Sequence, residues 1–132
     1  MEIRDATEDD AEELEALEIE LFRENCFNSA TIARELEYGF GLVAVDKQRG
    51  IIGYLLAAMD GNLVDVLRLG VVPEFRRRGL ARQMLNMALG ARPQAMLTVR
   101  RENRAAIKLY IDFGFYIAGE LASTAWVMKR LT

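Results

Sequence analysis

Residues 69–85 place an apolar β-type run, a loop with three arginines and an amphipathic helical segment directly after one another. A strand that leads through a short loop into a helix is a building unit of an α/β domain. Gly79, at the end of the basic loop, has no Cβ and lets a ligand approach the backbone. The free amides and positive dipole of a first helical turn attract an anion. The segment therefore predicts an anion site that suits a pyrophosphate.

Length and composition narrow the class of protein. With 132 residues, 52% of them hydrophobic and 28% charged, the chain is expected to form one globular domain over residues 1–132. Its longest apolar runs are too short to span a bilayer and its first residues lack a signal-peptide pattern, so we expect a cytoplasmic protein with no membrane partner. The 17 basic and 20 acidic residues give a net charge of −3, which argues against nucleic-acid binding.

Two residue types limit the chemistry. Cys26 is the only cysteine, so no disulfide forms within the chain, and we expect it to be an apolar filler. The chain has no histidine, which excludes Ser-His and Cys-His nucleophiles and every His-ligated metal site. Chemistry must therefore depend on Asp, Glu, Tyr, Lys, Ser, Thr or the backbone, and we expect no metal.

Apolar periodicity and turn residues predict the element order βααβββαβαββ. A capping box from Thr7 to Asp10 starts the first helix, and Ser29 is expected to cap the second, which stops at Gly39. The expected strands are 1–5, 40–46, 51–59, 63–72, 95–99, 115–121 and 125–131, and the later helices are 77–89 and 103–113. The strands from 40 to 72 are predicted to form an antiparallel meander.

The helices are predicted to be amphipathic. The first carries an acidic face, interpreted as solvated, with attraction of a cationic acceptor as the alternative. That face comprises Glu8, Asp9, Asp10, Glu12, Glu13, Glu15, Glu18 and Glu20. The third helix is expected to bury Leu80, Met84, Met87 and Ala88, and the fourth to align Ala106, Ile107, Tyr110 and Ile111.

Two motifs carry a family resemblance. Arg76-x-x-Gly79-x-Ala81, after Val71-Val72-Pro73, resembles the acetyl-CoA signature of the GNAT superfamily of N-acetyltransferases. Residues 103–115, with Asn103, Tyr110 and Gly114-Phe115, resemble the family's second segment, and the element order is the family's order. The motifs are most similar to the branch that acetylates N-terminal alanines of ribosomal proteins. The resemblance implies a single α/β domain with a mixed, mostly antiparallel sheet, splayed between strands four and five and flanked by helices.

The resemblance also implies a site for acetyl-CoA as acyl donor. It places the pantetheine arm along Leu69, Gly70 and Val71, held through main-chain hydrogen bonds. It places the pyrophosphate against the backbone amides of the Arg-x-x-Gly segment. The residues concerned are Arg76, Arg77, Arg78, Gly79, Leu80, Ala81 and Arg82. Asn103 is implied as a second cofactor contact, with helix capping as its alternative role.

Tyr110 lies where the family places the tyrosine that protonates the departing CoA thiolate, a role that suits a phenol with a pKa of ~10. The base is less clearly implied, because one branch has a Glu where this chain has Thr98. A gapless alignment with the histone-type branch puts that branch's catalytic Glu at Asp65, where burial would raise the carboxyl pKa. A solvent-facing Asp65 is the alternative, with Glu120 or water then acting as base.

The acceptor amine has no motif of its own. The family borders its acceptor site with the region of Phe22 and Phe27, which either line a groove or pack as core. The turn at 122–124 is short, so the cleft is expected to be open on that side. A lysine amine of pKa ~10.4 is almost wholly protonated at pH 7, whereas an α-amine of pKa ~8 is neutral about one time in ten. We therefore expect a peptide or protein α-amine, with a small-molecule amine or a non-catalytic acyl-CoA-binding module as alternatives.

Overall fold

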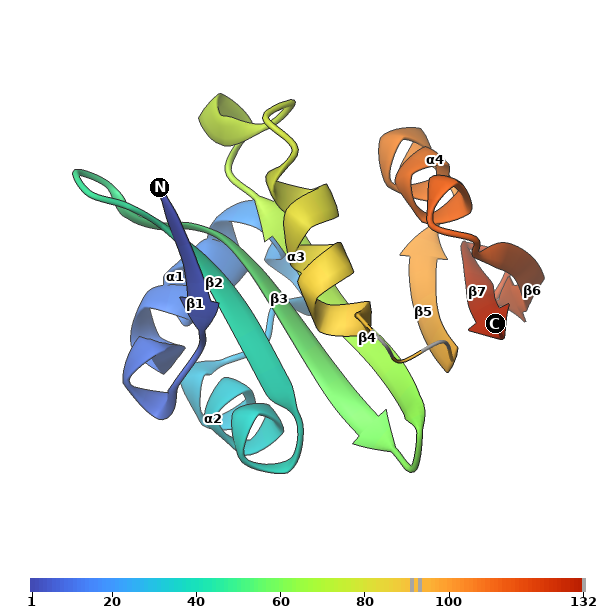
Figure 1. The fold of residues 1–132 in the computed structure, drawn as a ribbon, viewed down its shortest axis with the longest axis horizontal. Coiled ribbons are helices and arrows are strands. Elements are labelled where there is room, and N and C mark those ends of the chain that lie inside the picture. The colour runs from blue at the N-terminus through green and yellow to red at the C-terminus, as the bar shows by residue number, and fades with distance from the viewer. Residues whose placement is uncertain (91, 93, 132) are drawn as a thin grey trace.

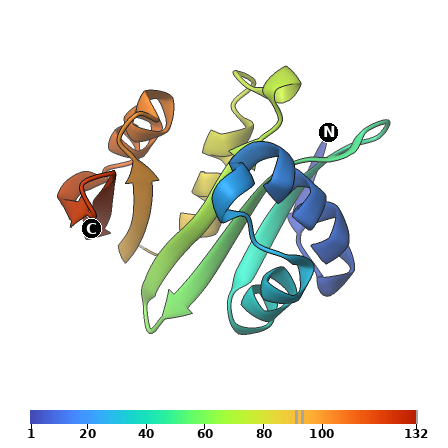
Figure 2. The same ribbon diagram turned by 180° about the vertical axis from the view of Figure 1, so that it is seen from behind.

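The computed structural model describes residues 1–90, 92 and 94–131 and shows a seven-stranded sheet with helices on both faces (Figures 1 and 2). The strands are β1 (Glu2–Asp5), β2 (Phe40–Asp46), β3 (Gly50–Asp60), β4 (Leu63–Val71), β5 (Gln94–Arg100), β6 (Tyr116–Leu121) and β7 (Ala125–Leu131). The helices are α1 (Ala11–Phe22), α2 (Ser29–Tyr38), α3 (Leu80–Leu89) and α4 (Arg104–Asp112). Short 3₁₀ turns are η1 (Glu8–Asp10), η2 (Arg23–Asn25) and η3 (Pro73–Phe75).

The sheet order is β1-β2-β3-β4-β5-β7-β6. Every neighbouring pair is antiparallel except β4 and β5, which are parallel and are joined over three residue pairs only, from Val64–Ala95 to Val66–Leu97. Beyond that point the two strands diverge, so the sheet has a V-shaped opening (Figure 1). The predicted α/β domain, its element order and its splay between strands four and five are confirmed.

A β-bulge in β4 lies at the start of this opening. Leu56 of β3 pairs with Arg68, but the next residue, Ala57, pairs with Val66, so Leu67 is an extra residue on β4. An extra residue reverses the in–out alternation of a strand. Val66 accordingly packs in the core that α3 covers, whereas Arg68 bonds to α1 on the opposite face. The bulge thus aims a charged side chain at α1.

Two hydrophobic cores hold the helices on the sheet. On one face, α3 buries Met84 and Leu85 against β3 and β4, and this core continues to Tyr110 of α4. On the other face, α1 and α2 bury Leu14 and Ile32 against Tyr54. Figure 2 shows α1 and α2 in front of the sheet and α3 behind it. Among the described residues, no helix combines the length and apolar character needed to cross a membrane.

Several local predictions need correction. Helix α3 begins at Leu80 rather than Arg77, because Arg77 (φ 65°) and Gly79 (φ 78°) adopt left-handed backbone that cannot continue a helix. Asn28, not Ser29, caps α2: its Oδ1 accepts from Thr31 N at 2.8 Å.

Two apolar side chains predicted to lie on buried helix faces are exposed. The buried stripe of α3 is centred on Met84, Leu85 and Ala88, so Met87 lies at its edge and is exposed. In α4 the buried residue is Tyr110, and Ile111 points about 100° away from it into solvent.

The acidic face predicted for the first helix, which the structure divides between η1 and α1, is also not simply solvated. Glu18 is fully buried, and Asp10 is buried in a bidentate pair with Arg4 while it accepts from Thr7 N at 2.8 Å. Glu13 accepts from Ile51 N at 2.7 Å, and Glu15 accepts from Ser29 N at 2.8 Å. These carboxylates satisfy backbone amides, which an exposed face would leave to water. Glu8, Asp9, Glu12 and Glu20 are exposed as predicted.

Candidate active site

The opening between β4 and β5 is the mouth of a cleft of about 790 Å³. Four parts of the chain line it: the end of α1 with the connection to α2, the centre of β4, the end of β5 with α4, and the β6–β7 hairpin. Its lining residues include Leu21, Phe22, Arg23, Glu24, Asn25, Phe27, Asp65, Leu67, Arg68, Leu69, Thr98, Arg100, Asn103, Tyr110, Leu121 and Thr124.

The loop from β4 to α3 leaves the N-terminus of α3 without a side-chain cap, and the loop with this first helical turn is hereafter called the cradle. A Cβ built on Gly79 would meet no atom within 4 Å, so this side of the backbone is free for a ligand. Within the described part of the chain, no side chain bonds to the N-terminus of α3, and the first intrahelical bond runs from Gln83 N to Gly79 O at 2.9 Å. The first-turn amides of Leu80, Ala81 and Arg82 therefore have no intrahelical acceptor. This geometry fits a phosphate group.

The arginine side chains around the cradle bond mostly to the protein itself. Arg76 Nε donates to Val71 O at 2.8 Å, and the Arg78 guanidinium lies 4.7 Å from the centroid of the Phe75 ring. Arg82 forms an ion pair with Asp112 at 3.4 Å. Both side chains are exposed, so the pair contributes little free energy and a ligand can displace it. The fixed part of the cradle is therefore its backbone.

The three residues predicted along the pantetheine arm lie in different surroundings. Leu69 lines the cleft. Gly70 lies beneath α1, where a Cβ would come within 3.1 Å of Leu21 Cδ1. Val71 is buried, and its carbonyl accepts the Arg76 bond. Of these three residues, Leu69 is the one that lines the cleft.

Tyr110 reaches the cleft from α4. Its ring is buried and packs at 5.8 Å, centroid to centroid, against Phe115. Burial raises the pKa of Tyr110 to about 12. The phenol therefore keeps its proton at neutral pH, which is the state that a general acid requires.

Asp65 and Thr98 line the same cleft from β4 and β5. Asp65 is half-buried, and burial, followed by the charge of Glu35, raises the pKa of its carboxyl group. A carboxylate with a raised pKa is a better proton acceptor than an exposed one. The alternative base, Glu120, is exposed and forms an ion pair with Arg101 at 2.9 Å.

Asn103 occupies the junction of β5 and α4. Its Oδ1 accepts from Ala106 N at 3.3 Å, so it caps α4, and the same residue lines the cleft. A cap of this kind fixes the helix that carries Tyr110.

The family of the chain follows from comparison with known proteins. The model of the acetyltransferase (GNAT) family matches residues 2–115. The chain belongs to the GNAT acetyltransferase family. The fold agrees: acetyl-CoA-bound NAA60 from Arabidopsis thaliana superposes with a TM-score of 0.82 at 22% identity, with 98% of each chain covered.

Two further solved structures share the fold of this GNAT domain. The PaiA N-acetyltransferase of Thermoplasma acidophilum, in complex with coenzyme A, has a TM-score of 0.80 at 18% identity, with both chains fully covered. Arabidopsis thaliana Naa50, in complex with the bisubstrate analogue CoA-Ac-MVNAL, has a TM-score of 0.79 at 16% identity and covers 98% of this chain and 99% of its own.

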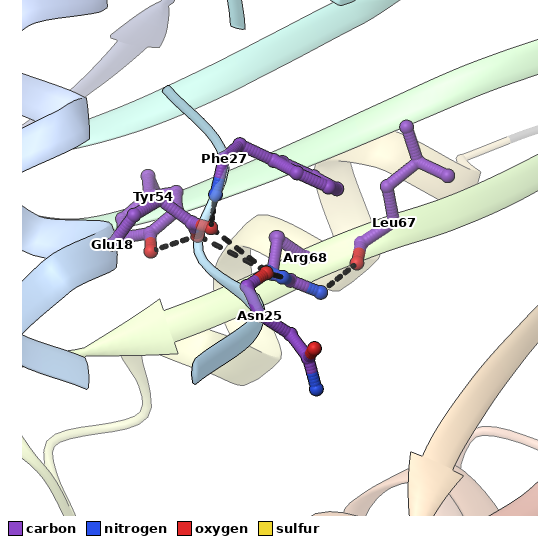
Figure 3. A network of polar contacts seen from close by, with 6 residues as sticks. All are labelled: Glu18, Asn25, Phe27, Tyr54, Leu67 and Arg68. Atoms are coloured by element: carbon purple, nitrogen blue, oxygen red, sulfur yellow. Dashed lines mark hydrogen bonds and ion pairs between the residues drawn. The ribbon is translucent and has the colours of Figure 1, made fainter. Parts of the chain in front are cut away.

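One polar cluster of this GNAT domain was not predicted from the sequence, and its Arg68 lines the cleft. Figure 3 shows Glu18 of α1, Tyr54 of β3 and Arg68 of β4 in one polar network. A signal for it exists in the sequence, since Glu18 continues the helical spacing of Leu14 and Leu21, and Arg68 interrupts an apolar strand. Two solvated side chains would give the same pattern, so the spacing alone does not predict the pair.

Proposed function

We propose that this GNAT protein transfers an acetyl group from acetyl-CoA directly to an amine. The observation that carries the proposal is the cleft where β4 and β5 diverge: Leu69 and Tyr110 line it, and the open helix N-terminus at Gly79 follows the end of β4. An anion site next to a cleft with a protonated phenol suits an acyl donor that carries a pyrophosphate and leaves as a thiolate.

In this proposal the backbone amides from Gly79 to Arg82 hold the pyrophosphate, and the pantetheine arm passes Leu69. Asp65, or a water beside it, accepts a proton from the amine nitrogen as that nitrogen forms its bond to the acetyl carbonyl carbon. The carbon–sulfur bond breaks, and Tyr110 donates its phenolic proton to the departing sulfur. Asp65, or the water beside it, then gives up its proton to solvent and solvent returns a proton to Tyr110, so the enzyme ends in its starting state.

We further propose a peptide or protein α-amine as the acceptor. The turn between β6 and β7 holds only Ala122, Ser123 and Thr124. A turn this short supports a cleft that admits a peptide chain rather than one closed around a small molecule. An α-amine also needs less help from a base than a lysine amine does. The complex of Naa50 with a peptide-bearing analogue supports this choice by fold similarity.

The donor half is tested by thermal unfolding with acetyl-CoA. A ligand present at about 100 times its Kd stabilises the folded state by about 2.7 kcal/mol. Gly79→Val should abolish this stabilisation, whereas Gly61→Val is a matched control, because Gly61 also has a positive φ of 61° and open space at its Cβ. An unchanged melting temperature of the parent protein at millimolar acetyl-CoA would contradict the donor site.

The acceptor half is tested by incubating the protein and acetyl-CoA with a peptide library and a panel of small amines, followed by mass spectrometry. We expect acetylation of peptide α-amines. Products confined to polyamines, amino sugars or lysine side chains would overturn the acceptor class. Acetyl-CoA binding without any product would favour a binding module, an alternative motivated by Thr98 in the cleft.

A further inference from the structure

The connection between α1 and α2 forms one wall of the cleft. Phe22 at the end of α1, and Asn25 and Phe27 of the connection, line the cleft together with Arg68; residues 22–27 are hereafter the 22–27 segment. The segment belongs to the face of the sheet that carries α1 and α2, whereas the cradle belongs to α3 on the opposite face (Figures 1 and 2). A donor held by the cradle therefore enters the cleft from one face of the sheet, and the 22–27 segment on the other face is free to contact the acceptor.

A buried carboxylate fastens this wall to β4. Glu18 is 0% exposed, and its Oε1 accepts from Phe27 N at 2.8 Å. Its Oε2 accepts from Tyr54 Oη at 2.5 Å, and both oxygens accept from Arg68 Nε at 3.1 Å (Figure 3). A buried carboxylate with a charged partner and two further donors is well satisfied, and loss of the charged partner is strongly destabilising.

Arg68 completes the attachment with every part of its guanidinium. One terminal nitrogen donates to Asn25 O and the other to Leu67 O at 3.4 Å. The guanidinium carbon lies 4.7 Å from the centroid of the Phe22 ring and 4.2 Å from that of Phe27. All three nitrogens thus donate within the protein, so the side chain serves the shape of the wall rather than binding of an anionic substrate.

We propose that Arg68 is a positioning residue that fixes the 22–27 segment as the acceptor wall and so sets affinity for the acceptor but not for acetyl-CoA. The assignment rests on the proposed function for its kinetic part only. The bulge at Leu67 turns Arg68 toward Glu18 of α1. Helix α1 lies on the face of the sheet opposite to α3, which carries the cradle (Figures 1 and 2).

The test uses Arg68→Lys. Lysine keeps a positive charge for Glu18, so the buried carboxylate stays paired. It lacks the planar fork that donates to Asn25 O and lies near the rings of Phe22 and Phe27. Glu18→Gln is the second variant, because its amide oxygen still accepts from Phe27 N while the charge that holds Arg68 is gone. Both variants are first checked for a cooperative melt and for stabilisation by acetyl-CoA.

Two readouts follow. The KM for the acceptor peptide should rise about tenfold while the KM for acetyl-CoA stays within about twofold, since loss of positioning acts on the misplaced substrate alone. The rate at which Cys26 reacts with a thiol reagent should also rise about tenfold, because Cys26 is the only cysteine, is half-buried and lies within the 22–27 segment. The second readout needs no acceptor.

Arg4→Lys is the matched control. Arg4 also holds a buried carboxylate, that of Asp10, but neither residue lines the cleft. We expect it to lower the melting temperature without changing the acceptor KM or the Cys26 rate. A folded Arg68→Lys protein with parental values for both readouts, or equal changes in the control, would overturn the positioning role. Failure of the parent protein to acetylate any amine would instead count against the proposed function, and the Cys26 readout would still decide the attachment of the segment.

Discussion

The proposed mechanism requires Tyr110 to hold its phenolic proton until the sulfur departs. Its pKa of about 12 keeps the phenol protonated, and removal of a general acid costs roughly 10² to 10⁴ in rate. Tyr110→Phe keeps the ring that packs on Phe115, so we expect a fall in kcat of that size with little change in acetyl-CoA binding. Steady-state kinetics and thermal shift measure the two quantities. Parental turnover in the variant would assign protonation of the sulfur to solvent.

Asp65 gives a prediction for both the stability and the pH dependence of activity. Its pKa is raised, by burial first and by Glu35 second, so the folded chain holds this proton more tightly than the unfolded chain. Ionisation of Asp65 therefore costs stability as pH rises through the unfolded and then the folded pKa, and the cost persists at neutral pH. Asp65→Asn should raise the melting temperature at pH 7 and remove the acidic limb of the kcat/KM profile.

The neighbour of Asp65 supplies the control. Glu35→Gln removes a negative charge that raises the pKa of Asp65, so the acidic limb should move to lower pH without disappearing. An unchanged limb in Asp65→Asn would leave water or Glu120 as the base.

Residues were predictable from the sequence where a motif fixes backbone geometry. Gly79 at the start of a helix and Tyr110 on the helix after Asn103 lie where the motifs indicate. Glu18 and Arg68 were not found, because a lone charge on an amphipathic face has the same pattern whether it is solvated or paired across the core. Glu18 and Arg68 are 50 residues apart in the chain, a separation that local periodicity does not cover.

Among the helices, α4 offers a test of the two roles considered for Asn103. As an N-cap, its replacement by Ala should lower stability by about 1 kcal/mol. Asn28→Ala removes the equivalent cap of α2, which is remote from the cradle, and should cost a similar amount. If Asn103 also contacts the donor, only its variant should weaken acetyl-CoA binding in a titration. Equal binding by both variants would leave Asn103 as a cap alone.

Strand β4 shows why element boundaries were predicted better than side-chain directions. Its range was expected as 63–72 and is Leu63–Val71. The bulge at Leu67 was not expected, because an extra residue in one strand depends on how its partner pairs, and alternation in a mostly apolar strand gives no register. The direction of Arg68, and with it the shape of the cleft wall, follows from that single residue.

At the scale of the whole molecule, the sheet consists of two parts that meet along a short seam. β1 to β4 carry α1 to α3, and β5 to β7 carry α4 (Figure 1). Three residue pairs join β4 to β5, and the core reaches Tyr110 across the seam. A donor bound between the diverging strands would contact both parts, so its binding energy would resist their separation.

This arrangement predicts a pattern of amide hydrogen exchange. Saturating acetyl-CoA should slow exchange at the free end of β4, in the first turn of α3 and in α4, because opening of these elements then requires loss of the ligand. The amides of the β1–β2 pair, which lies at the far edge of the sheet, should exchange at the same rate with and without ligand. Gly79→Val should show no slowing at any of these sites. Protection confined to α3 would mean that the donor does not bridge the two parts of the sheet, because a bridging ligand must protect α4 as well.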